Sequence, residues 1–116
     1  MNIAKLQQRL REFTAERDWD QFHSPKNLAM ALTSEAGELA EVFQWMSEDQ
    51  SRTLDESSTN MAAAKEELAD VMIYLLRLTD VLHINLEEAV NENIALNEAK
   101  YPVGVSRGNA TKYNRR

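Results

Sequence analysis

The sequence predicts an all-α protein, a four-helix bundle followed by an extended or mobile C-terminal tail. Apolar residues recur at spacings of three and four over most of the chain, which is the period of an amphipathic helix. No segment shows the strict apolar–polar alternation of a strand, and only three glycines and two prolines interrupt the 116 residues. This length suits one main domain, which we place at residues 1–102, with the tail at residues 103–116.

The first two helices are each expected to begin at a polar cap. The first runs from about Asn2, a suitable N-cap, to Trp19. Its apolar stripe consists of Ile3, Leu6, Leu10 and Phe13. The second begins after Ser24, because a serine followed by a proline at the first helical position (Pro25) is typical of a helix start, and it continues to about residue 45 or 46. Its stripe consists of Leu28, Leu32, Leu39, Val42 and Met46.

A polar stretch separates the second helix from the third. Residues 47–58 are rich in Ser, Asp and Glu and are expected to form a loop. The third helix is expected from about Thr59 to Leu82. Its inward residues are Ala64, Leu68, Val71, Met72, Leu75 and Leu78.

The fourth helix is expected to start at Asn85, because Asn85 and Glu88 resemble a capping box, and to run to about residue 100. The tail that follows contains two glycines and a basic end formed by Lys112, Arg115 and Arg116. Four helices of these lengths cannot bury all their apolar faces if the fourth is short, so we expect association with a second copy.

Composition narrows the function. A net charge of −6 argues against nucleic-acid binding through a broad basic face. The absence of cysteine excludes disulfides, redox thiols and thiolate metal sites. No apolar run is long enough for a bilayer and no leader precedes the first helix, so an intracellular, cytoplasmic protein without a membrane partner is expected. No glycine-rich phosphate loop is present, so this acidic chain would need cations to bind a triphosphate.

Two acidic pairs occupy the middles of the second and third helices. Glu35 and Glu38 form an E-x-x-E pair, and Glu67 and Asp70 form an E-x-x-D pair. Residues three apart share a helix face, so the four carboxylates would converge if the helices packed antiparallel. Like charges oppose one another's ionisation, and a divalent cation removes that cost. All-oxygen ligation suits Mg²⁺, or Mn²⁺, although solvated glutamates are the ordinary alternative.

The residues around the acidic pairs are expected to support a site. Ala36, Gly37 and Ala69 lie inside the pairs, and small residues there would allow close helix approach. Glu41 and Glu66 are also acidic, and Glu66 is expected to be more exposed than Glu67. A di-iron bundle requires Glu-x-x-His on two helices, and neither histidine of the chain follows a glutamate at that spacing.

The order of these motifs resembles the MazG-like all-α nucleoside triphosphate pyrophosphohydrolases, and within them the dCTP pyrophosphatase-like branch. The similarity runs from about residue 5 to residue 113. It is carried by RDWDQFH (17–23), PKNL (25–28), EAGELAE (35–41), FQW (43–45), EELADVMIY (66–74), Asn97 with KYP (100–102), and KY (112–113).

The resemblance implies an Mg²⁺-dependent hydrolase that converts a deoxynucleoside triphosphate, dCTP or a 5-substituted dCTP first, to the monophosphate and pyrophosphate. Its biological sense would be cleansing of the nucleotide pool. The four acidic residues would match the family's metal ligands, and catalysis would rest on positioning and charge neutralisation. Family members pair as homo-dimers, often as homo-tetramers, with the nucleotide between subunits.

The resemblance also implies a set of nucleotide-binding residues. Trp19 and Trp45 would enclose the base, though as isolated aromatics both also suit a core. His23 would lie near the base or be an exposed loop histidine. Tyr74, one turn after Asp70, would pack against the deoxyribose or be a core tyrosine.

Residues for the phosphates and sugar are expected further along the chain. Asn97 and Lys100 match the family's phosphate- or sugar-contacting positions, or form an ordinary solvated helix end. Relatives carry lysine where this chain has Asn93, so Lys26, otherwise a surface lysine, or Lys100 would compensate. The alternatives for function are the same chemistry on another nucleotide, such as dUTP, dATP or a damaged nucleotide, and a non-catalytic helical interaction module.

Overall fold

The computed structural model describes residues 1–115 and confirms the all-α class: within these residues every regular element is a helix. The chain forms two compact units, Met1–His83 and Ile84–Arg116. The boundary between them falls before the fourth long helix, so this helix groups with the tail and not with residues 1–83. Among the described residues, no helix combines the length and apolar character needed to cross a bilayer.

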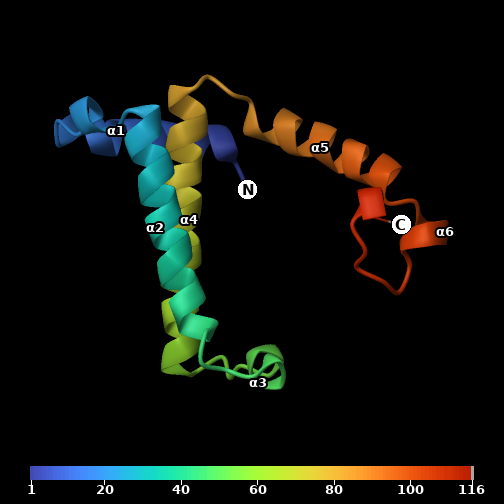
Figure 1. Ribbon diagram of the computed structural model, residues 1–116. Helices are drawn as coiled ribbons and strands as arrows, with labels where there is room; N and C mark the ends of the chain where they lie inside the picture. Colours follow the sequence, from blue (N-terminus) through green and yellow to red (C-terminus); the bar gives the residue numbers. More distant parts are fainter. Residues whose placement is uncertain (116) are drawn as a thin grey trace. The chain divides into compact units, whose positions relative to one another are not determined.

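The centre of the first unit is a pair of long antiparallel helices, α2 (Pro25–Phe43) and α4 (Thr59–Val81) (Figure 1). Helix α1 (Ile3–Glu16) packs against α4, across the end of the pair where α2 begins (Figure 1). Burial is shallow for a chain of this size: among the described residues, the buried apolar ones are Leu28, Ala64 and Leu76. The antiparallel arrangement brings the middles of α2 and α4 together, which is where both acidic pairs lie.

Three of the four long helices begin at the cap that the sequence predicts, and α4 begins at Ser58, the last residue of the loop that the sequence predicts. Asn2, Ser24, Ser58 and Asn85 each accept a hydrogen bond from the backbone N–H three residues later, which satisfies an otherwise unpaired donor. A full reciprocal capping box occurs elsewhere, at Ser47. Local chemistry therefore sets the helix starts before any tertiary packing is considered.

Helix ends and the central loop depart from the sequence prediction. Helix α1 stops at Glu16 and not at Trp19, because Asp18 takes a left-handed backbone (φ 53°) that no α-helix continues. A short 3₁₀ helix, η1 (Asp20–Phe22), follows, and α2 ends at Phe43. The expected loop at 47–58 contains a five-residue helix, α3 (Glu48–Arg52), which the Ser47 capping box starts.

The second unit consists of α5 (Leu86–Lys100), α6 (Val103–Ser106) and the 3₁₀ turn η2 (Tyr113–Arg115). The tail is thus not extended throughout: the Tyr113 ring lies edge-on to Tyr101 at 6.0 Å and under the Lys100 ammonium at 5.0 Å. Helix α5 has no buried residue. Of the predicted basic end, Arg116 lies outside the described residues.

Candidate functional site

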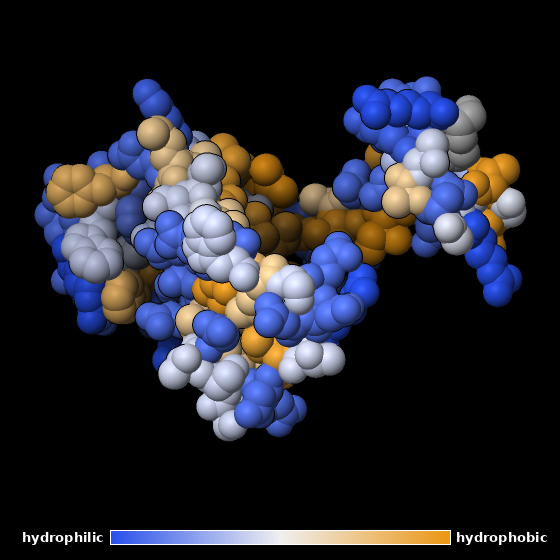
Figure 2. All heavy atoms as spheres, turned by 60° about the horizontal axis from the view of Figure 1, so that its bottom comes forward, coloured by the Kyte–Doolittle hydropathy of each residue, from blue (hydrophilic) through white to orange (hydrophobic). Residues whose placement is uncertain are grey.

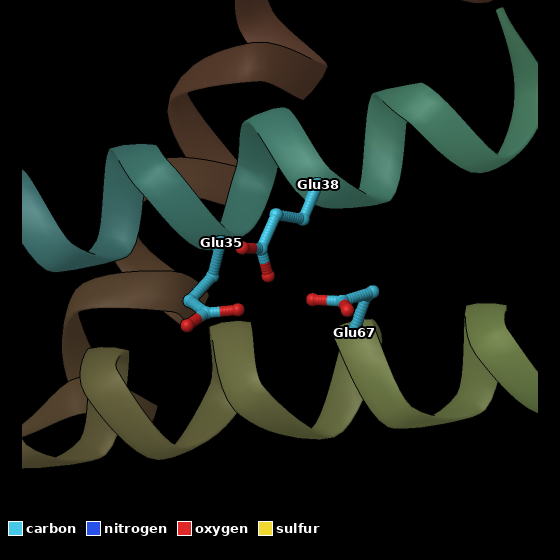
Figure 3. A group of neighbouring side chains, drawn as sticks. All are labelled: Glu35, Glu38 and Glu67. Carbon is cyan, nitrogen blue, oxygen red and sulfur yellow. The ribbon is translucent and has the colours of Figure 1, made fainter.

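Three carboxylates from the two central helices meet in the space between them. Glu35 and Glu38 extend from α2, and Glu67 extends from α4 to meet them (Figure 3). One oxygen of each carboxylate lies within 4.8 Å of the others. The spacing of three within α2 places both of its glutamates on the face toward α4, as the sequence predicts.

Asp70, the fourth predicted ligand, does not belong to this close group of three carboxylates. It follows Glu67 by one helical turn, is partly buried, and its charge helps to raise the pKa of Glu35. Glu35 and Asp70 line the same cleft. The structure therefore brings three of the four acidic residues together and sets the fourth at their edge, while their role as ligands stays a prediction.

The electrostatics of the group oppose full ionisation. The pKa of Glu35 is raised because its protonated form can donate to the Glu38 carboxyl, and partial burial adds to the effect. Partial burial, together with the neighbouring carboxyls of Glu35 and Glu38, raises the pKa of Glu67 to about 7. Carboxylates are acceptors only, and Oε2 of Glu35 and Oε2 of Glu67 have no hydrogen-bond partner within residues 1–115.

Unpaired, partly buried carboxylate oxygens are costly unless a proton or a cation compensates them. The oxygen-only donor set fits a hard divalent cation such as Mg²⁺ or Mn²⁺ and not a thiolate-preferring metal. Two of the three converging glutamates have a buried oxygen without a hydrogen-bond partner among the described residues, and this agrees with a cation site.

The small residues inside the acidic pairs have a different role from the one expected. Ala36, Gly37 and Ala69 are exposed, and a Cβ added at Gly37 would contact nothing within 4 Å. On either helix, a residue one or two positions from a glutamate that faces the partner helix is rotated by about 100° to 200° around the helix axis, so it points away from the partner. Close approach of α2 and α4 does not depend on these residues.

A cleft of about 830 Å³ runs beside the carboxylates. Five of the residues predicted from sequence line it, namely Trp19, His23, Glu35, Asp70 and Tyr74. Its other walls are mainly apolar, and several apolar residues of the first unit remain on the surface, such as Leu68, which is 55% exposed. Figure 2 shows such orange apolar atoms exposed among the blue hydrophilic atoms.

The aromatic wall of the cleft is held from α1. The Trp19 ring stands edge-on to Phe13 at a centroid distance of 5.6 Å, and the Arg17 guanidinium lies 3.8 Å over the Phe13 ring. Trp19 nevertheless remains 44% exposed. It is therefore a supported surface aromatic, which is the environment of a stacking platform and not that of a core tryptophan.

The remaining predicted nucleotide residues do not line this cleft. Trp45 is 89% exposed and lies just beyond the end of α2, whereas Trp19 precedes its start. Lys26 is exposed in the first turn of α2. Asn97 and Lys100 belong to the second compact unit, and both are exposed.

Sequence reasoning missed one buried charge near the cleft. Arg77 is 5% exposed and contacts Asp20, His23 and Asp80. The signal was present: Glu67, Asp70, Tyr74 and Arg77 follow one another at spacings of three, four and three, so all four lie on one face of α4.

Comparison with known proteins agrees with the geometry. The MazG-like family model matches residues 30–115. The chain is 49% identical over 102 residues to dCTP pyrophosphatase 1 of Mus musculus and 44% identical to that of Homo sapiens, and each match covers 88% of this chain. The chain spans only 60% of the length of these curated relatives.

A solved structure shares the fold. The crystal structure of a pyrophosphatase from Archaeoglobus fulgidus superimposes with a TM-score of 0.80 at 44% sequence identity, and the match covers 88% of this chain and 94% of that one. Taken with the convergence of acidic residues between two long helices, the family match over most of the chain leads to one conclusion. The chain belongs to the MazG-like family.

Proposed function

We propose that this chain is a magnesium-dependent nucleoside triphosphate pyrophosphohydrolase. Its substrate would be a deoxynucleoside triphosphate, with dCTP or a 5-substituted dCTP first, and its products the monophosphate and pyrophosphate. The observation that carries the proposal is the meeting of Glu35, Glu38 and Glu67 beside an aromatic-walled cleft. Relatives 44–49% identical to this chain are named dCTP pyrophosphatase 1, which supports the choice of base.

The three glutamates, with Asp70 at their edge, would hold the cation. Bound Mg²⁺ would neutralise phosphate charge and activate a water, as is ordinary for this ion. The carboxylates of the chain fix the position at which phosphates can approach an otherwise acidic protein. Their rigid placement on two packed helices is the main contribution of the fold, because phosphoryl chemistry depends on positioning and electrostatic stabilisation.

The cleft would accept the nucleoside. Trp19 offers an exposed ring face for the base, and Tyr74, one turn beyond Asp70, would lie against the sugar. The apolar lining excludes water from the nucleoside while the carboxylates remain at its edge. Lys26, Asn97 and Lys100 are proposed to serve the phosphates or the sugar.

A homo-dimer, or a dimer of dimers, follows if Trp45 also contacts the base. Helix α2 separates the two tryptophans in the chain, and its 19 residues span roughly 28 Å at 1.5 Å per residue. A single nucleobase is much shorter than this distance. Trp45 would therefore complete the pocket of a second copy, which also accounts for its 89% exposure in one chain.

A substrate panel with and without Mg²⁺ tests the proposal. We expect pyrophosphate release from dCTP only with the metal, and the same panel decides whether dUTP, dATP or a damaged nucleotide is preferred. Glu38→Gln and Asp70→Asn should each lower turnover by about a hundredfold or more while the helical CD signal is retained. Glu41→Gln, an exposed α2 glutamate one turn beyond Glu38, is the matched control.

Two results would count against the proposal. Absence of turnover of every nucleotide with metal present would remove the enzymatic function. Wild-type rates in the Glu38 or Asp70 variants would remove the ligand assignment. A non-catalytic interaction module, the alternative, predicts that neither Mg²⁺ nor nucleotide raises the melting temperature, since only ligands of the folded state stabilise it.

A further inference from the structure

Arg77 is a buried cation whose partners all belong to the first unit. Burying a guanidinium is costly unless charged and polar groups compensate it. Its Nη1 lies 3.8 Å from the Asp80 carboxylate and its Nη2 lies 3.3 Å from the Asp20 carboxylate. Asp80 is also bound by Arg11 at 2.7 Å, so two arginines share that carboxylate.

The third partner of Arg77 is a histidine of the cleft. Arg77 Nε lies 3.4 Å from Nδ1 of His23 and donates to it. A guanidinium has N–H donors and no acceptor, so Nδ1 of His23 must be the acceptor and carries no proton. The neutral His23 ring therefore holds its single proton on Nε2.

The charges around His23 keep its ring neutral. Partial burial and the positive charge of Arg77 lower the pKa of His23, and the negative charge of Asp20 only partly opposes them. No hydrogen bond of the described residues engages Nε2, so this N–H has no acceptor within residues 1–115. His23 and Arg77 both line the cleft beside the carboxylates, and both also line a second cavity with Asp20 and Asp80.

We propose that Arg77 is a positioning residue that holds His23 in the tautomer protonated at Nε2, so that the cleft presents a hydrogen-bond donor to the base. The ligand selected is a pyrimidine whose ring nitrogen is an acceptor. This inference rests on the proposed function and deepens it, because it assigns the choice of base to a residue outside the carboxylate group.

The chemistry of the bases sets the direction of the selection. N3 of cytosine has a free lone pair, whereas N3 of thymine and of uracil carries a proton. The Nε2–H donor of His23 forms a hydrogen bond with N3 of cytosine. With thymine or uracil, the same donor faces the N3–H group, which is also a donor, and no hydrogen bond forms. An unmade hydrogen bond in a cleft costs more than the bond itself contributes, so dCTP is favoured over dTTP and dUTP.

The tautomer itself is tested first, in the wild-type protein. The chain has two histidines, and His83→Gln assigns the imidazole signals of His23. Two-bond ¹H–¹⁵N correlation spectra at neutral pH should show Nδ1 unprotonated and Nε2 protonated. A spectrum with the proton on Nδ1, or an average of the two tautomers, overturns the inference whether or not the protein turns over nucleotides.

Variants then test selectivity. Arg77→Met keeps the length of the side chain, and replacing a buried ion by an apolar residue of similar size is often tolerated. We expect the ratio of kcat/KM for dCTP to that for dTTP to fall about tenfold, with kcat for dCTP little changed. Arg77→Lys retains a donor and should partly restore both the ratio and the tautomer.

Arg11→Gln is the matched control. It removes the 2.7 Å ion pair between Arg11 and Asp80, and Arg11 makes no hydrogen bond to His23 within the described residues. It should leave tautomer and selectivity unchanged. An Arg77→Met protein that keeps both wild-type tautomer and wild-type selectivity overturns the inference.

If the wild type turns over no nucleotide, the proposed function fails. The inference about Arg77 and His23 is then tested by comparing the binding of dCMP with that of dTMP. A preference for dCMP that Arg77→Met loses supports the inference, and equal or absent binding overturns it.

Discussion

If Glu67 is a metal ligand, as proposed, it must lose a proton before it can bind the cation, so Mg²⁺ binding would depend on pH. Its pKa is raised to about 7. At about pH 8 roughly nine molecules in ten are ionised at this position, and at about pH 6 roughly one in ten. Because only the ionised carboxylate binds a cation, the apparent Mg²⁺ affinity should weaken about tenfold between these two pH values.

Isothermal titration of the metal checks this magnitude. In two buffers of different ionisation enthalpy, Mg²⁺ binding at about pH 7 should release about half a proton per site from Glu67. Glu67→Gln should bind the metal more weakly at the higher pH and show little change of affinity with pH. Glu66→Gln, exposed on the same helix, is the control and should behave as the wild type. Wild-type affinity that does not vary over this range, or a tenfold change that survives in Glu67→Gln, would refute the reasoning.

The raised pKa of Glu67 also makes the stability of the folded state depend on pH, in a direction that can be predicted. The folded state keeps this proton up to about pH 7, whereas a carboxyl with the ordinary value of 4.5 loses it much earlier. The raised pKa of Glu67 therefore stabilises the folded state fully below about pH 4.5. This stabilisation is lost as the pH rises through about 7. Without metal, Glu67→Gln should melt above the wild type at about pH 8, and this advantage should shrink toward about pH 5. Thermal melts in the presence of a chelator measure it.

Three further predictions concern the fold. His83 ends α4 with a left-handed backbone (φ 57°), so His83→Gly should raise the free energy of unfolding by about 1 kcal/mol in urea titrations, whereas His83→Ala should not. Leu76→Ala should lower it by about 3 kcal/mol, because this side chain is 2% exposed, while Leu68→Ala, at 55% exposure, should cost less than about 1 kcal/mol; equal losses would contradict the burial pattern. Ser58→Ala removes the cap of α4 and should cost about 1 kcal/mol, and Ser58→Asp should recover most of it.

The elements that local chemistry determines could be predicted from the sequence. Ser24 with Pro25 marks the start of α2, the predicted start of the third helix at Thr59 agrees with α4, and the spacing of Glu35 and Glu38 places both on one face. The convergence of these residues with Glu67 needed only the further assumption of antiparallel packing. Such features depend on neighbours within about one helical turn.

Features that depend on distant neighbours could not be predicted. Leu68 belongs to the expected apolar stripe of α4, yet the surface there is open, whereas Leu76 and Arg77 are buried near the end that α1 covers. Sequence periodicity cannot say which part of a long helix another helix will cover. The left-handed turn at Asp18 was equally unpredictable, since aspartate permits that conformation without requiring it.

The length of α2 sets a further condition on activity. If a base is held by Trp19 of one copy and Trp45 of another, only associated chains can turn over the nucleotide. Turnover per chain must then fall when the protein is diluted below the dissociation constant of the oligomer. Substrate would in turn draw chains together, because it binds the associated form alone. A 19-residue helix would thus make the rate depend on how much of the protein a cell contains.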